Sequence, residues 1–321
     1  MSETSRFEMF ANRLTKMQRH WGKWARRQSI SCYRVYDNDI PEFPLAVDVY
    51  ESILHVSEYA RDHGMEPEEH AAWLDGCIET LSAVFDIHPN LIYLKFRQRQ
   101  KGLRQYERFA RTGAEYIVRE NGLKFIINPS DYLDAGLFLD HRNTRQMVRQ
   151  ESGGKRVLNL FAYTGSFSVY AAAGGALETL TVDMSNTYLQ WADRNLALNG
   201  LANDHNRLLQ ADVLSWLQQP VQEKWDLVVL DPPTFSNSKR MDGTLDVQRD
   251  HVDLLQLVFR HMAPGGVLYF STNYRRFKLD QAAFEGLAYQ DISKKTVPED
   301  FRNKRIHQCF RFHPNPIFTQ G

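Results

Sequence analysis

The sequence is poor in cysteine, has no net charge and contains no long apolar run. Its three cysteines, Cys32, Cys77 and Cys309, are far apart, and none belongs to a Cys-x-x-Cys pair. This spacing predicts neither a disulfide framework nor a zinc site, so we expect no metal and a reducing, cytoplasmic environment. No apolar stretch approaches the roughly 20 residues of a membrane span, and the N-terminus has no apolar signal-peptide core. We therefore expect neither a membrane anchor nor export.

The absence of net charge hides an uneven distribution. The chain carries 39 Lys or Arg and 39 Asp or Glu, a balance that by itself argues against binding to nucleic acid. However, residues 1–36 hold eight basic residues against two acidic ones, and residues 95–111 hold seven against Glu107 alone. Such patches attract phosphate backbones whatever the overall charge. The alternative is a solvated helix face and a solvated loop.

With 321 residues, 43% of them hydrophobic, the chain is long enough for more than one domain. Apolar spacings of three and four predict a basic amphipathic helix over residues 5–28. The next hundred residues predict a small α+β domain whose elements are strands at 31–37, 45–59 and 92–97, a helix at 67–85, and a hairpin of 115–119 with 124–128. We place the domains at 1–30, 31–130 and 131–321.

The last part alternates strands with helices. Strand patterns end at Phe161, Asp183, Asp212, Asp231 and Asn273, and helices are expected between them, including 188–199, 245–262 and 279–287. Segments 290–296 and 306–311 are expected to pair as a terminal antiparallel hairpin. Five βα units followed by such a hairpin form an α/β fold with a Rossmann-like sheet, typical of class I methyltransferases rather than dehydrogenases.

The stretch from Val157 to Asp183 predicts a strand, a turn, a helix and a second strand, which together form a ligand crevice. A dinucleotide site needs Gly-x-Gly-x-x-Gly at the turn, because the pyrophosphate lies against bare backbone. Here only Gly165 is present. This disfavours a nicotinamide oxidoreductase and favours a nucleoside without a pyrophosphate, such as S-adenosylmethionine. Asp183 is placed to accept ribose hydroxyls, and Asp212 to meet the adenine amine.

The motif Asp231-Pro232-Pro233-Thr234-Phe235 follows the fourth strand of this region. Two prolines cannot continue a strand and hold the backbone rigidly, so they fix Asp231 at the mouth of the crevice. A flat base could stack on Phe235 for about 1–3 kcal/mol. The alternative is a structural turn with Phe235 in the core. We predict that Asp231, Pro232, Pro233 and Phe235 form the catalytic side of the site.

The acceptor atom is left open between several chemistries. In the amino-methylating motif an aromatic residue directly follows the second proline, whereas here Thr234 intervenes. Methylation of cytosine C5 needs a thiolate, and neither neighbouring loop holds a cysteine. A ring nitrogen such as guanine N7 loses no proton and needs only orientation and electrostatic fit. A non-catalytic RNA-binding module that retains the fold is a further alternative.

The segment from Tyr132 to Arg142 bridges the two expected domains and opens a helix running to about Glu151. Asp140, His141 and Arg142 follow an apolar triplet there. Because ligand pockets are common at domain junctions, these charged residues are candidates for a binding site. A cluster of capping and ion-pair interactions is the alternative.

Several motifs resemble the C-terminal (RlmK) half of the bacterial RlmKL family, the 23S rRNA guanine-N7 methyltransferases. They are CYRVYDNDIPE, YLDAGLFLDHR, NLFAYTGSFSVYAAAGGA, TVDMSNTYLQWADRNLALNGL and DPPTFSNSKRM with LDVQRDH. The resemblance covers about Phe10 to His307. It implies S-adenosylmethionine as cofactor and 7-methylguanosine in domain V of large-subunit rRNA as product. The residues it places at the cofactor are Phe138, Asp140, Arg142, Asn159, Phe161, Tyr163, Gly165, Asp183, Asp212 and Asp231.

The resemblance also implies that the basic helix and the small domain hold RNA. The residues expected to contact it are Arg19, Lys23, Arg26, Arg27, Arg97, Arg99, Lys101, Arg104, Lys239 and Arg240. In the fused family members a second methyltransferase, which makes 2-methylguanosine, precedes this half. This sequence holds no such part, so we expect a stand-alone relative or an excised piece with a separate guanine-N2 methyltransferase as partner. The expected substrate is naked 23S rRNA or an assembly intermediate, and the expected state is a monomer.

Overall fold

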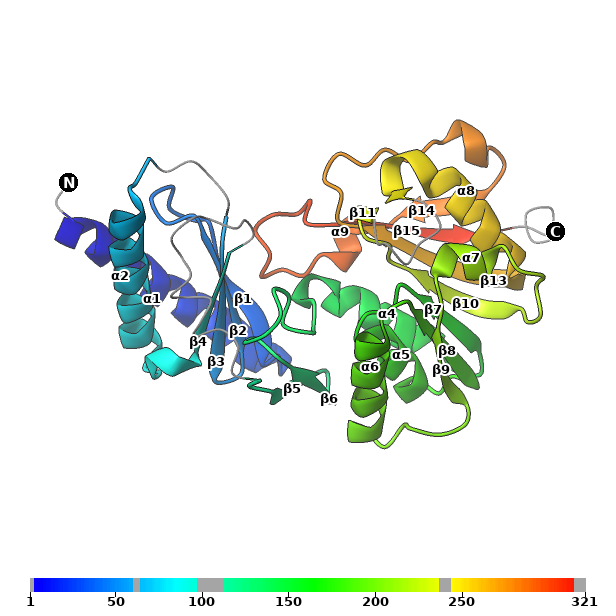
Figure 1. The fold of residues 1–321 in the computed structure, drawn as a ribbon, viewed down its shortest axis with the longest axis horizontal. Coiled ribbons are helices and arrows are strands. Elements are labelled where there is room, and N and C mark those ends of the chain that lie inside the picture. Colours follow the sequence, from blue (N-terminus) through cyan, green and yellow to red (C-terminus); the bar gives the residue numbers. More distant parts are fainter. Residues whose placement is uncertain (1–2, 60–63, 97–112, 237–243, 315–321) are drawn as a thin grey trace. The chain divides into compact units, whose positions relative to one another are not determined.

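The computed structural model describes residues 3–59, 64–96, 113–236 and 244–314. The chain divides into two compact units (Figure 1). Unit 1 comprises Met1–Leu139 and Glu299–Arg302, and unit 2 comprises Asp140–Pro298 and Asn303–Gly321. The sequence suggested boundaries near residues 30 and 130, without a return of the chain to the first unit.

Unit 1 is a four-stranded sheet with two helices. The strands lie in the order β1 (Cys32–Asp37), β2 (Leu45–Tyr50), β3 (Ile53–Glu58) and β4 (Ile92–Phe96), antiparallel except for the β3–β4 pair. The helices are α1 (Glu3–Gln28) and α2 (Pro67–Phe85), and a 3₁₀ turn, η1 (Pro89–Leu91), precedes β4. A separate hairpin joins β5 (Tyr116–Glu120) to β6 (Leu123–Ile127).

Helix α1 is part of the core of unit 1. Its apolar face buries Phe10 and Leu14 completely, and the Phe10 ring stacks on Phe43 with 4.2 Å between ring centroids. Gly76 lets α2 approach this helix closely, because a Cβ there would lie 2.4 Å from the Phe7 ring. The exposed back of α1 carries its basic residues except Arg13, which is half-buried and pairs with Asp39 at 2.8 Å.

Unit 2 is built on a seven-stranded sheet in the order β14-β15-β13-β10-β7-β8-β9. The strands are β7 (Arg156–Leu160), β8 (Glu178–Asp183), β9 (Asn206–Gln210), β10 (Trp225–Leu230), β13 (Met262–Thr272), β14 (Ala288–Asp291) and β15 (Gln308–His313). The first five of these in chain order pair in parallel, and β15 pairs antiparallel with both β13 and β14. A short ladder joins β11 (Phe235–Ser236) to β12 (Leu245–Asp246).

Helices cover both faces of this sheet (Figure 1). The helices are η2 (Leu139–His141), α4 (Arg142–Glu151), α5 (Ser166–Ala173), α6 (Asn186–Leu198), α7 (Val213–Leu217), α8 (Val247–Arg260), η3 (Ala282–Phe284) and α9 (Ser293–Thr296). Strand β10 shows why two layers form. Trp225, Val228 and Leu230 pack with α7 and α8, whereas Leu227 and Val229 pack with α4 and α5. Side chains of a strand alternate between faces, so this central strand is apolar on both faces from Leu227 to Leu230.

Three predicted elements of the chain are wrong in detail. The run 45–59 is two strands, β2 and β3, which turn at Glu51 with a φ of 57°. The helix expected at 279–287 is only the 3₁₀ turn η3. The strand expected at 290–296 is β14 at 288–291, followed by α9. Within the described residues, no helix is long and apolar enough to cross a membrane.

Candidate functional site

The parallel strands of unit 2 end at one level, and most of the predicted site residues follow these ends. Leu160 pairs with Val182 on one side and with Leu230 on the other, and Leu230 pairs with Phe270. The next residues along the chain are therefore neighbours at this edge, namely Phe161, Asp183, Asp231 and Ser271. The strand order reverses between β7 and β10, where ligands of open α/β sheets bind.

The turn between β7 and α5 has an unusual backbone. Phe161 and Tyr163 have φ values of 54° and 52°, and Gly165 has 72°. Left-handed conformations are costly for residues with a Cβ and concentrate at functional sites. A Cβ on Gly165 would also lie 2.6 Å from the Cβ of Ala192 in α6. The glycine is thus required by its φ and by the close approach of α5 to α6, reasons that the sequence did not reveal.

Asp183 ties this turn to the turn after β8. Its carboxylate accepts the backbone N–H of Tyr163 at 2.9 Å and that of Ser185 at 2.8 Å. Burial raises the pKa of Asp183, and the backbone hydrogen bonds from Ser185 and Tyr163 oppose that shift. Each carboxylate oxygen has a second lone pair, so the group can accept further donors from a ligand.

Asp212 and Asn159 differ in how they are placed. Asp212 caps α7 by accepting the N–H of Ser215 at 2.8 Å, and its side chain remains partly exposed. It lies two residues after Gln210, which pairs with Asp183 in the sheet. Asn159 is buried within β7, where its amide donates to the hydroxyl of Ser168 at 2.9 Å. Asp212 can therefore reach a ligand directly, whereas the Asn159 side chain holds α5 on the sheet.

The Asp231 carboxylate is fixed by partners from two other segments. The Ser271 hydroxyl, at the end of β13, donates to Oδ1 at 2.5 Å, and the Nε2 atom of His141 lies 3.6 Å from Oδ2. Pro232 is buried and Pro233 exposed. Phe235 is not a core residue, since 56% of it is exposed.

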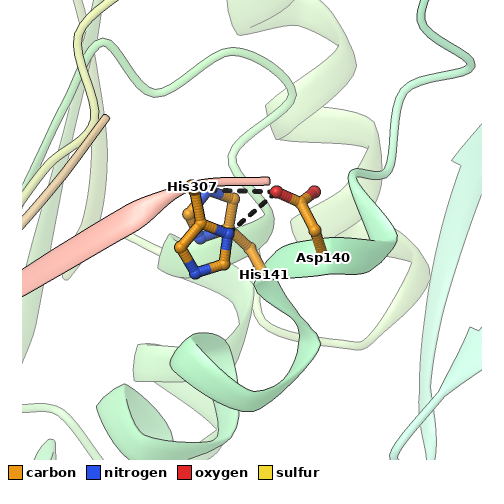
Figure 2. A group of neighbouring side chains, drawn as sticks. All are labelled: Asp140, His141 and His307. Atoms are coloured by element: carbon orange, nitrogen blue, oxygen red, sulfur yellow. Dashed lines mark hydrogen bonds and ion pairs between the residues drawn. The ribbon is translucent and has the colours of Figure 1, made fainter. Parts of the chain in front are cut away.

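His141, which faces Asp231, stacks on His307 beside Asp140 (Figure 2). The rings of His141 and His307 are 4.3 Å apart and inclined by 10°. The Nδ1 atom of His307 donates to Asp140 at 2.9 Å, and its Nε2 atom lies 2.9 Å from the Thr296 hydroxyl. Burial lowers the pKa of His141 despite the nearby carboxylates of Asp231 and Asp140. The neutral His141 ring therefore carries one proton, and Nε2 faces both carboxylates.

Asp140, His141 and His307 also have the chemistry of metal ligands, with potential ligand atoms within 4.8 Å of one another. Their geometry fits a hydrogen-bond network better. Zinc requires lone pairs that converge on one point about 2.0–2.1 Å from each nitrogen, but the two rings are nearly parallel, so their in-plane lone pairs run side by side. Both His307 nitrogens are already engaged. The cluster therefore positions Asp140 and Asp231.

The other predicted site residues are distributed over both units. Arg142 is buried at the start of α4, and Phe138, 41% exposed, belongs to unit 1. On α1, four predicted RNA contacts are all exposed: Arg19, Lys23, Arg26 and Arg27. The remaining predicted contacts lie outside the described residues: Arg97, Arg99, Lys101, Arg104, Lys239 and Arg240.

Sequence reasoning missed Ser271 and His307, which hold the two carboxylates. Neither belongs to a recognisable motif, and both reach the site from distant segments. His141 was visible only as part of a charged run after an apolar triplet. Ser271 could have been found from its position near the end of the next predicted strand, because parallel strands bring their carboxyl ends together and so place this residue beside Asp231.

Fold and site define a class I methyltransferase, and comparison with known proteins agrees. The model of the S-adenosylmethionine-dependent methyltransferase family matches residues 63–303. The crystal structure of the methyltransferase SMU.776 complexed with SAH is similar in fold, with a TM-score of 0.73 and 21% identity over 94% of this chain and 81% of that one. The cofactor of this protein is S-adenosylmethionine, and the acids after β8 and β9 fit a nucleoside of this kind.

Two curated relatives are closer in sequence. Ribosomal RNA large subunit methyltransferase K of Neisseria meningitidis is 52% identical over 94% of this chain and 86% of its own length. Ribosomal RNA large subunit methyltransferase K/L of Pseudomonas entomophila is 52% identical over 95% of this chain. The chain spans only 42% of the latter protein. The chain belongs to the S-adenosylmethionine-dependent methyltransferases and, within them, to the family of large-subunit methyltransferase K.

Proposed function

We propose that this protein transfers a methyl group from S-adenosylmethionine to N7 of a guanine in 23S rRNA, giving 7-methylguanosine. The names of the two relatives support the large ribosomal subunit RNA as substrate. The choice of N7 comes from the family resemblance and from the chemistry available at the end of β10. The cofactor, when bound, supplies a methyl group on a positively charged sulfur.

The buried state of Cys309 is the observation that carries this choice against carbon methylation. Cys309 lies on β15, and its thiol is fully buried. Burial raises the pKa of this thiol well above its usual value, and the negative charge of Asp231 raises it further. Cys32 and Cys77 are buried in unit 1. Methylation of cytosine C5 needs an accessible thiolate, and none of the three cysteines supplies one.

Asp231 suits the orientation of a base better than the removal of a proton. Guanine N7 reacts through its lone pair, so no general base is needed and catalysis rests on positioning. The carboxylate of Asp231 is held by Ser271 and faces His141. In this proposal its remaining lone pairs accept N–H groups on the edge of the base, and Phe235 stacks on the ring.

The cofactor residues have separate tasks in this proposal. Asp183 accepts the ribose hydroxyls with the lone pairs that Tyr163 and Ser185 leave open. Asp212 accepts a hydrogen bond from the adenine amine with carboxylate lone pairs other than the one that the Ser215 N–H occupies. Phe161, Tyr163 and Gly165 provide the turn against which the nucleoside lies. Asp140 and Arg142 complete the cofactor side within unit 2.

Product mapping tests the acceptor atom. Unmodified 23S rRNA is incubated with enzyme and donor, and the product is located by mass spectrometry of nuclease fragments and by chain cleavage specific for 7-methylguanosine. We expect one 7-methylguanosine. A methyl group on a cytosine carbon or on an exocyclic amine would contradict the proposal. If calorimetry detects no S-adenosylmethionine binding, a non-catalytic RNA-binding role becomes the better explanation.

A variant pair tests the stacking role of Phe235. Replacement Phe235→Ala should raise KM for RNA about tenfold, since stacking contributes on the order of 1–3 kcal/mol. Leu177→Ala is the matched control, because Leu177 is also apolar, 63% exposed and in unit 2, but precedes β8 at the other end of the sheet. Equal KM values for both variants would remove Phe235 from the proposed site.

The biological setting is proposed on the same grounds. We expect a monomer in the cytoplasm that acts on naked 23S rRNA or on an assembly intermediate, with guanine-N2 methylation supplied by a separate enzyme. Parallel assays on deproteinised rRNA and on immature large-subunit particles distinguish the two substrate forms.

A further inference from the structure

Unit 1 contains a groove that the methyl-transfer site does not use. Two adjoining hollows, of about 620 and 290 Å³, share five lining residues. We call them together the Tyr33 groove. The shared residues are Gly22 and Arg26 of α1, Tyr33 of β1, Val49 of β2 and Glu51 of the β2–β3 turn. Pockets of about 300–1,000 Å³ are those in which small ligands are held.

The rim of the groove is basic. Arg19 and Arg26 lie seven residues apart on α1, which places both on one side of the helix. Both are exposed, and within the described part of the chain neither forms an ion pair. Arg119 adds a third guanidinium from the β5–β6 hairpin and is anchored by Glu51, which accepts its backbone N–H at 2.8 Å. Glu51 is the acid among the shared residues and forms an ion pair with the Arg119 guanidinium at 3.7 Å, so Arg19 and Arg26 supply the excess positive charge of the rim.

The floor of the groove presents an aromatic ring. Tyr33 is half-buried, and burial raises the pKa of its hydroxyl, which therefore stays neutral. Gly22 keeps the space above this hydroxyl open: a Cβ there would lie 3.6 Å from the Tyr33 hydroxyl and 3.5 Å from Arg26 Nη1. Gly22, which has no side chain, therefore lies beside the neutral hydroxyl of Tyr33 and the guanidinium of Arg26.

We infer that the Tyr33 groove binds an unpaired nucleotide of the RNA substrate, with Arg19 and Arg26 on its phosphates and its base against Tyr33. This inference rests on the proposed function only in taking RNA as the partner. Single-stranded RNA is recognised by bases that are turned out and stacked on aromatic rings or guanidinium planes. A duplex keeps its bases stacked and offers none to a groove of this size. The groove therefore selects unpaired RNA.

Binding of the full chain to RNA tests the inference without the methylation reaction. The probe is a fluorescent single-stranded RNA of about 12 nucleotides, a length within the usual range for such sites, compared with the same sequence in a duplex. Arg26→Ala should weaken single-strand binding about tenfold and lower the dependence on salt by about one phosphate contact. Arg6→Ala is the control: this arginine is also exposed on α1, but it lines neither hollow and is not among the predicted RNA contacts.

A second pair of variants fills the groove without changing its charge. Gly22→Leu should place a side chain over Tyr33 and weaken single-strand binding about tenfold, whereas Gly22→Ala makes only ordinary contacts and should bind as the original chain does. Three results would each overturn the inference: equal binding by Gly22→Leu and Gly22→Ala, equal losses in Arg26→Ala and Arg6→Ala, or a preference for the duplex. Product mapping is independent: 7-methylguanosine could still form if the groove failed, and the groove could bind if mapping failed.

Discussion

Asp183 has a structural task and, in the proposed function, a ligand-binding task as well. Its carboxylate joins the β7–α5 turn to the β8–α6 turn through Tyr163 and Ser185. The same two turns enclose the space where the nucleoside is proposed to lie. Loss of this carboxylate would therefore leave two backbone donors without their acceptor and also remove the partner of the ribose.

We predict that Asp183→Ala weakens S-adenosylmethionine binding about tenfold to a hundredfold, because hydrogen bonds to a charged acceptor contribute about 1.5–3 kcal/mol. Isothermal titration calorimetry measures the change. Asp193→Ala is the control, since Asp193 is an exposed carboxylate on the neighbouring helix α6. Unchanged affinity in Asp183→Ala would remove this residue from the cofactor site.

His55 gives unit 1 a dependence on pH. Burial lowers the pKa of this ring to about 4, and its Nε2 atom lies 3.1 Å from the Leu133 carbonyl oxygen. The unfolded chain, with a histidine pKa near 6.5, binds more protons than the native state between pH 4 and pH 6.5. The stabilisation is complete above about pH 6.5 and is lost as the pH falls toward 4.

We expect unit 1 to lose about 2 kcal/mol of stability from this ring between pH 7 and pH 5. Hydrogen exchange of the β3 amides, corrected for intrinsic rates, measures it. His55→Gln removes the titrating group, so the fall in stability over this interval should shrink by about that amount. The same pH slope in both proteins would show that His55 does not carry the effect.

At the scale of elements, Gly165 decides whether α5 and α6 can pack. Gly165→Ala places a Cβ at a φ of 72° and 2.6 Å from Ala192. Gly200 offers a matched control, because its φ is 69° and nothing lies within 4 Å of an added Cβ. The two substitutions thus share the backbone cost and differ in the steric one.

Gly200→Ala should cost about 1–2 kcal/mol in the free energy of unfolding, the penalty of a left-handed residue with a Cβ. Gly165→Ala should cost about 1–3 kcal/mol more, because overpacking adds to it. Urea denaturation of the two variants gives the difference directly. If both lose the same amount, the approach to Ala192 is not what requires the glycine.

Sequence patterns predicted elements well where periodicity and turn chemistry agreed. The helix expected at 67–85 is α2, and the hairpin around Asn121-Gly122 forms with both residues at positive φ. The β2–β3 turn was missed because Glu51-Ser52 carries no glycine or asparagine to mark it. The helix at 279–287 was overpredicted because its apolar spacing reflects burial of Phe284 and Leu287 in the sheet's core.

The candidate site was predictable only in part, for a related reason. Residues that immediately follow strands, such as Asp183 and Asp231, can be found because strand ends of a parallel sheet converge. Their partners, such as Ser271 and His307, cannot be found in this way, because the local sequence around each of them gives no sign of the contact. The strained backbone at Phe161 and Tyr163 is likewise a property of the assembled turn.

At the scale of the molecule, the chain crosses from one unit to the other more than once. Glu299–Arg302 lies after the sheet helices of unit 2 in sequence but belongs to unit 1. There Asp300 accepts the backbone N–H of Arg34 at 2.9 Å, and Phe301 packs under the Arg34 guanidinium at 4.5 Å. Glu299 accepts the indole N–H of Trp24 at 2.7 Å. Unit 1 is therefore completed by residues from near the other end of the sequence.

Phe301→Ala should destabilise unit 1 by about 3 kcal/mol, since the ring is 98% buried and large-to-small changes leave a cavity. Hydrogen exchange of the β1 amides should rise, while that of the β7 amides should not. Phe284→Ala, an equally buried phenylalanine in the core of unit 2, should give the reverse pattern. Phe301 is close in sequence to β15, which belongs to the sheet of unit 2. If the cooperative units followed sequence order, Phe301→Ala would therefore speed hydrogen exchange at β7. That outcome would contradict the assignment of Glu299–Arg302 to unit 1.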